Sequence, residues 1–120
     1  MALVDAVPAG IYGKMALQSG GHWSQVKSLV VQTDNVRSAL ALVSKGEASL
    51  GIVYASDLHS ANVAVVTEFP QTAHAPIVYP MAVIAGTPDP SAARGFQAFL
   101  MTDAAQDTFA RHGFSSPDRP

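Results

Sequence analysis

The chain has 120 residues, of which 48% are hydrophobic, and this length suits one domain with a buried core. Its 7 basic and 9 acidic residues give a formal net charge of −2, which argues against nucleic-acid binding because that function needs a basic patch. It contains no cysteine, so neither a disulfide framework nor a cysteine-ligated metal site is expected.

The first third of the chain predicts two short strands and two helices. A strand at residues 2–4 precedes a helix that begins at Pro8 and ends at the Gly20–Gly21 pair. Proline fits the first turn of a helix, where its missing N–H has no intrahelical partner to lose. A second short helix is expected at 22–28, followed by a strand at 29–32.

Residues 33–57 predict a capped helix, a tight turn and a buried strand in quick succession. The side-chain acceptors at the helix start are Thr33, Asp34 and Asn35. Gly46 follows the last turn, and the apolar run 50–54 forms a strand that ends in Tyr54. Ligands of open α/β sheets bind at the carboxyl ends of strands and the amino ends of helices. The amides around Val36 and the Tyr54 hydroxyl are therefore candidate parts of a binding site.

The second half predicts two more strands and two helices. The strands are expected at 63–68 and 77–85, the second interrupted by Pro80. Helices are expected at 91–100 and up to Gly113, the last one starting with a capping pair of Asp103 and Gln106. Strands alternating with helices predict an α/β fold with a mostly parallel sheet flanked by helices.

Three motifs, in this order and spacing, resemble a known family. They are Val-Pro-Ala-Gly-Ile-Tyr at 7–12, Asp-Asn-Val-Arg at 34–37 and Leu-Gly-Ile-Val-Tyr-Ala-Ser-Asp at 50–57, and the ending Phe-Ala-Arg-His-Gly-Phe at 109–114 agrees with them. Together they resemble the molybdate-binding solute receptors of ABC importers over nearly the whole chain.

The resemblance covers only the second half of such receptors, which have two lobes with the anion between them. It implies one lobe of a type II periplasmic-binding-protein fold. Residues 1–78 would form the second, anion-binding lobe. Residues 79–120 would supply the crossover strand and the C-terminal helices that, in the family, pack on the first lobe, which this chain lacks.

The resemblance also implies an oxyanion site made of neutral donors. Carried over by position, the donors are the Ala9 N–H, the Val36 N–H and the Tyr54 hydroxyl. The residues themselves agree, because Ala9 and Val36 each lie at a predicted helix start, where amides lack intrahelical acceptors. The expected ligand is molybdate or tungstate, with no other cofactor and molybdenum present only as its oxyanion. Without the resemblance, a proline at a helix start and a tyrosine ending a strand are more often structural.

The expected function is therefore binding, not catalysis, as the periplasmic substrate receptor of an ABC importer, with the signal peptide outside this chain. Its partners would be a small oxyanion and the membrane permease. Half a cleft supplies half the donors, so we expect weak binding, and the apolar faces of the last helices predict a homodimer or a domain swap. The alternatives are a receptor for another oxyanion such as sulfate, and a ligand-sensing effector domain of a regulator. Scattered histidines predict no metal-ion site; they are His22, His59, His74 and His112.

Overall fold

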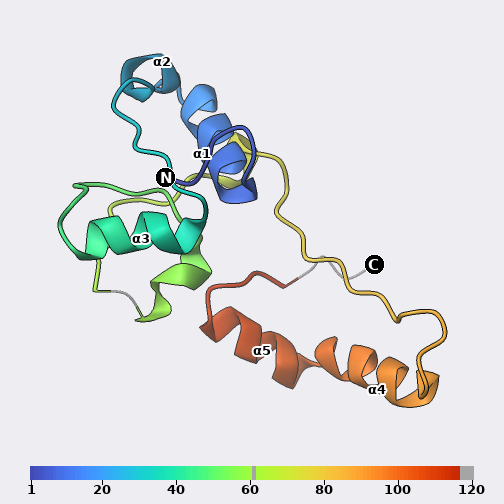
Figure 1. Cartoon of the computed structure of the whole chain (residues 1–120). Coiled ribbons are helices and arrows are strands. Elements are labelled where there is room, and N and C mark those ends of the chain that lie inside the picture. The colour runs from blue at the N-terminus through green and yellow to red at the C-terminus, as the bar shows by residue number, and fades with distance from the viewer. Residues whose placement is uncertain (61, 117–120) are drawn as a thin grey trace. The chain divides into compact units, whose positions relative to one another are not determined.

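A computed structural model describes residues 1–60 and 62–116 of the chain (Figure 1). The chain forms two compact units, one made of Met1–Pro76 and the other starting at Ile77. The expected assignment of residues 1–78 and 79–120 to a lobe and a returning segment stays a prediction, and residues 61 and 117–120 lie outside the described ranges. None of the helices in those ranges has the length and apolar character needed to cross a membrane.

The helices of the first unit follow the expected order. They are α1 (Pro8–Ser19), α2 (Trp23–Val26) and α3 (Val36–Ser44), with short 3-10 helices η1 (Ala55–Ser60) and η2 (Gln71–Ala73). The predicted start at Pro8 is confirmed, and α1 ends one residue before Gly20. Gly46 follows α3 with a φ of 75°, a left-handed conformation that glycine adopts without a steric cost.

Two short segments pair in parallel at the centre of the first unit. The Met1 amino group donates to the Val31 carbonyl at 2.9 Å, the Thr33 N–H to the Met1 carbonyl at 3.0 Å, and the Leu3 N–H to the Thr33 carbonyl at 2.9 Å. This alternation is the hydrogen-bond pattern of a parallel ladder, centred on a bridge between Ala2 and Thr33. The segments predicted as strands at 2–4 and 29–32 therefore meet, but over a few residues only.

The expected mostly parallel sheet is not found in the described ranges. The runs 50–54, 63–68 and 77–85 have no strand assignment there, and the single bridge between Ala2 and Thr33 is the only sheet-like pairing that they contain. A run of β-branched residues becomes a strand only when another backbone segment accepts its hydrogen bonds. In these runs Val66 and Val78 are 77% and 74% exposed. Apolar side chains alone were therefore not enough to bury these segments.

The core of the first unit is built around small residues on α1. Its buried positions are Ala9, Gly10, Gly13 and Ala16. Gly10 touches backbone directly, since a side-chain carbon there would clash with the carbonyl oxygens of Ala2 and Leu3. A methyl group added at Gly13 would lie 3.0 Å from Ile52 Cγ2, so the run 50–54 also lies against this face. The small side chains let α1 approach two backbone segments closely.

The second unit contains α4 (Pro90–Leu100) and α5 (Asp103–Arg111), which contact each other. The Asp89 carboxylate caps α4 by accepting a hydrogen bond from the Ala92 N–H at 2.9 Å. The predicted capping pair of Asp103 and Gln106 is wrong, because Thr102 is the residue that caps α5. Gln106 instead donates through Nε2 to the Leu100 carbonyl at 2.7 Å, joining α5 to the end of α4.

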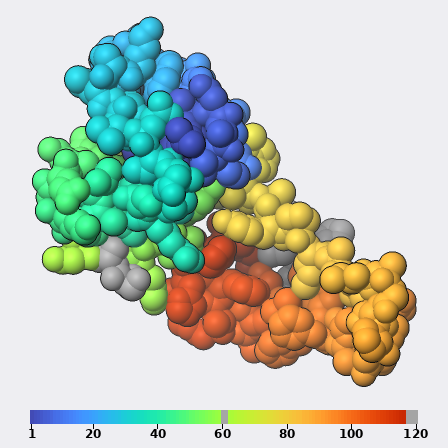
Figure 2. Space-filling model, viewed as in Figure 1, coloured from blue at the N-terminus to red at the C-terminus, as the bar shows by residue number. Residues whose placement is uncertain are grey.

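Aromatic residues dominate the contacts of the second unit. The ring of Phe114 packs edge-on against Tyr79 and Phe109, with centroid distances of 5.7 and 6.1 Å. Helix α4, which lies in the orange part of Figure 2, buries none of its residues. Phe96 and Phe99 are 60% and 54% exposed. Exposed apolar residues of this kind favour association, and the homodimer of the sequence analysis stays a prediction.

Replacing Gly10 by alanine should destabilise the protein by about 2 kcal/mol, because the new carbon meets two backbone carbonyls that cannot move independently of α1. The measurement is urea unfolding followed by circular dichroism. Gly95→Ala in α4 is the matched control, since open space surrounds Gly95 and alanine favours a helix over glycine by about 1 kcal/mol. Equal stability of Gly10→Ala and the parent chain would contradict the close approach.

Candidate functional site

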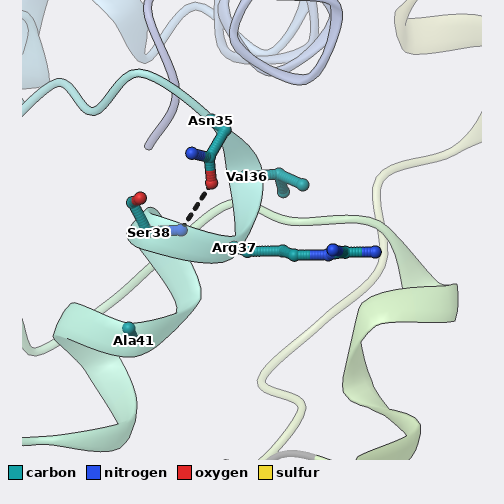
Figure 3. A pocket seen from close by; sticks show the side chains of 5 residues that line it. All are labelled: Asn35, Val36, Arg37, Ser38 and Ala41. Atoms are coloured by element: carbon teal, nitrogen blue, oxygen red, sulfur yellow. Dashed lines mark hydrogen bonds between the residues drawn. The ribbon is translucent and has the colours of Figure 1, made fainter.

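The start of α3 is a capped helix terminus with amides left over for a ligand. Asn35 has an extended backbone, and its Oδ1 accepts a hydrogen bond from the Ser38 N–H at 2.8 Å (Figure 3). Val36 and Arg37 are the first two residues of the helix, so their N–H groups have no acceptor inside it. The partial positive charge of the helix terminus is thus concentrated at these two amides.

A cluster of side chains holds this terminus in place. Asp34 Oδ1 accepts two hydrogen bonds, from Asn35 Nδ2 at 3.0 Å and from Ser38 Oγ at 3.0 Å. The Thr33 hydroxyl donates to the Asn35 carbonyl at 2.8 Å. Thr33 also belongs to the parallel bridge with Ala2, so the turn before α3 is attached to the centre of the unit.

The start of α1 has a different construction. The helix begins at Pro8 after Val7, whose apolar side chain cannot cap it, and the Val7 N–H donates to the Leu3 carbonyl at 3.0 Å. The amides of Ala9 and Gly10 therefore lie in the first turn without an intrahelical acceptor. Ala9 is only 5% exposed, so a group that hydrogen-bonds to its amide must approach closely.

Tyr54 is half-buried and stands immediately before η1. The Asp57 carboxylate accepts a hydrogen bond from the Tyr54 N–H at 3.0 Å, and the Asp57 N–H donates to the Tyr54 carbonyl at 3.0 Å. This reciprocal pair fixes the backbone of Tyr54 at the end of the run 50–54.

The three predicted site residues belong to one compact unit, and contacts near each of them connect their elements. Ala2 pairs with Thr33, three positions before Val36. Gly13 of α1 lies against Ile52, two positions before Tyr54. Gly51 meets Val43 of α3, where an added carbon would lie 2.8 Å from Val43 Cγ2. The structure thus joins the three elements, and the role of their donors toward an anion stays a prediction.

A shallow hollow opens at the start of α3. The residues that line it are Asn35, Val36, Arg37, Ser38 and Ala41 (Figure 3). Arg37 is exposed and its side chain extends away from the helix, and it is the charged residue among those that line the hollow. Lys14 is engaged elsewhere, in an ion pair with Asp5 at 2.6 Å and 5.6 Å above the Trp23 ring.

Two residues of this region were missed by reasoning from the sequence. Ser38 was not assigned a role, although its spacing of three residues from Asn35 is that of a helix cap and its recipient amide. Asp57 entered the sequence analysis only as the last residue of the motif at 50–57, whereas it holds the Tyr54 backbone. Residues 1–60 and 62–116 contain no group of three or more side chains suited to a metal ion.

A family model described as bacterial extracellular solute-binding protein matches residues 1–115, and the chain belongs to this family. Within it, the chain is 43% identical over 112 residues to the molybdate-binding protein ModA of Escherichia coli (strain K12). It is 40% identical over 111 residues to the molybdate-binding protein ModA of Haemophilus influenzae. Each match covers 92% of the chain and 43% of the relative, so the chain spans less than half the length of these relatives.

A solved structure resembles the chain over nearly its whole length. It is the substrate binding domain of a protein assigned as a molybdenum ABC transporter, from Clostridium difficile. The TM-score is 0.85 at 30% sequence identity, and the match covers 98% of this chain and 52% of that one. The resemblance recognised in the sequence is confirmed, and the chain has the fold of about half of that substrate-binding domain.

Removing the cap of α3 should weaken its first turn. We expect Asn35→Ala to lower the free energy of unfolding by about 1 kcal/mol, because the Ser38 N–H loses its acceptor. Asn35→Ser keeps a side-chain acceptor at the same position and should cost only a fraction of that. Urea unfolding of the two variants checks this, and equal losses in both would show that the cap does not stabilise the helix.

Proposed function

We propose that the chain binds molybdate or tungstate, as part of the substrate receptor of an ABC importer. The observation that carries the proposal is the likeness to two molybdate-binding proteins over 92% of the chain. The anion would be held by the Ala9 N–H, the Val36 N–H and the Tyr54 hydroxyl, from three elements of one unit.

The chemistry of these groups suits a fully ionised tetrahedral anion. The proposed donors, two amides at helix starts and a phenol, are themselves neutral. A fully ionised dianion needs donors only, whereas a protonated phosphate brings an O–H that requires an acceptor. Neutral donors should hardly separate molybdate from tungstate, because the two anions are nearly equal in size and charge.

The further parts of the proposal follow from the family. The chain would act outside the cytoplasmic membrane, in the periplasm, and deliver its anion to the permease of the importer, as a binding protein without catalysis. Its donors are those of one part of a longer receptor, so weak binding is expected from the chain by itself. Another oxyanion such as sulfate is the competing ligand, and it offers the same tetrahedral set of acceptors.

Molybdate should raise the melting temperature of the chain, because a ligand that binds only the folded state stabilises it by an amount set by its concentration relative to Kd. The measurement is a thermal melt followed by circular dichroism at several molybdate concentrations, with sulfate at equal ionic strength as control. A rise in melting temperature with sulfate and none with molybdate would show that sulfate is the ligand. No shift with either anion at high concentration would show that the chain does not bind them by itself.

Tyr54→Phe should weaken molybdate binding about tenfold, because the variant removes one hydrogen bond to a charged ligand and keeps the ring. Calorimetric titration with sodium molybdate measures the change. Tyr79→Phe is the matched control, since Tyr79 loses the same hydroxyl and belongs to the second unit. An affinity of Tyr54→Phe equal to that of the control would exclude the hydroxyl as a ligand.

A further inference from the structure

We propose that Asp34 is a positioning residue of the oxyanion site, which fixes the Val36 and Arg37 amides by holding the cap of α3. The inference rests on the proposed function. Asp34 is not one of the proposed donors to the anion, because it contacts the cap residue Asn35 instead. It comes from the side chains that surround the turn between Thr33 and Ser38.

One oxygen of Asp34 organises that turn. Its Oδ1 accepts hydrogen bonds from Asn35 Nδ2 and Ser38 Oγ, each at 3.0 Å. The same Asn35 side chain uses its oxygen to accept the Ser38 N–H at 2.8 Å. A ring of hydrogen bonds at the first turn of α3 therefore joins Asp34, Asn35 and Ser38. In addition, the Thr33 hydroxyl donates a hydrogen bond to the Asn35 carbonyl.

The ring determines which amides at the start of α3 can donate a hydrogen bond to a ligand. Ser38 is the third residue of α3, and its N–H is taken by Asn35. The N–H groups of Val36 and Arg37 are the ones left in the first turn, and both residues line the hollow of Figure 3. If Asn35 rotates, it can expose the Ser38 amide and turn its own NH2 group toward the helix start. Asp34 opposes this rotation because its Oδ1 accepts a hydrogen bond from Asn35 Nδ2.

The charge of Asp34 and its hydrogen bonds should have opposite effects on the affinity for an anion. A carboxylate beside a helix amino end stabilises the helix, but it repels an anion that approaches the same end. Asp34 can therefore favour anion binding only by holding the Val36 and Arg37 amides in position. Positioning and electrostatics thus predict different effects of two substitutions at Asp34.

The test compares Asp34→Ala with Asp34→Asn in calorimetric titrations with sodium molybdate. Asparagine keeps an acceptor oxygen for Asn35 and Ser38 and removes the charge, whereas alanine removes both. We expect Asp34→Ala to bind about three- to tenfold more weakly than the parent chain, the loss of a typical hydrogen bond. Asp34→Asn should bind at least as tightly as the parent chain. Asp89→Ala, which removes the cap of α4 in the second unit, is the matched control and should leave binding unchanged.

Three outcomes would overturn the inference. Tighter binding by both variants would leave charge repulsion as the only effect of Asp34. Equal weakening of both would make the charge itself the favourable element. Unchanged binding by Asp34→Ala would remove any role in the site.

Amide hydrogen exchange, read by NMR without ligand, separates this inference from the proposed function. If the parent chain does not bind molybdate, the proposed function of the isolated chain fails, and exchange at Ser38 still decides the positioning. Exchange there should be about three- to tenfold faster in Asp34→Ala and unchanged in Asp34→Asn and Asp89→Ala. Unchanged exchange in Asp34→Ala would refute the positioning role even where binding is absent.

Discussion

The first unit depends on the close approach of α1 to the backbone of residues 2–3, which glycine at position 10 permits. The carbonyl oxygens of Ala2 and Leu3 occupy the space that a side chain would need. Leu3 in turn accepts the Val7 N–H just before the helix, and Ala2 pairs with Thr33 just before α3. Two helix starts are thereby attached to the same short parallel pairing. Their relative placement is set by backbone contacts, which tolerate far less variation than contacts between flexible side chains.

Two of the proposed donors belong to elements that this pairing joins, and Arg37 is the charged side chain among the residues that line the hollow at the start of α3. Each helix start offers amides with a partial positive charge, and Tyr54, fixed through Asp57, adds a hydroxyl from a third element. Lys14 pairs with Asp5 and Asp34 holds the turn before α3, whereas Arg37 is exposed beside the helix start. Recognition by such donors depends on the shape and protonation of the anion more than on its net charge.

The second unit leaves large apolar side chains of α4 exposed. Helix α4 is strongly amphipathic, yet Phe96 and Phe99 stay exposed, while Phe114 gathers Tyr79 and Phe109 into a small cluster. The chain spans 43% of the length of the relative from Escherichia coli.

The sequence by itself determined the order of the main helices, the start of α1, both ends of α3 and the family. Pro8, Asn35 and Gly46 mark helix ends correctly because a cap and the amide that it satisfies lie within a few residues of each other. Only the tertiary structure decided the rest. The apolar runs looked like strands of a parallel sheet, but a strand needs a partner that is distant in sequence, and just the pair around Ala2 and Thr33 met in the described ranges. The supporting role of Asp57 and the choice of Thr102 over Asp103 as a cap depended likewise on backbone geometry.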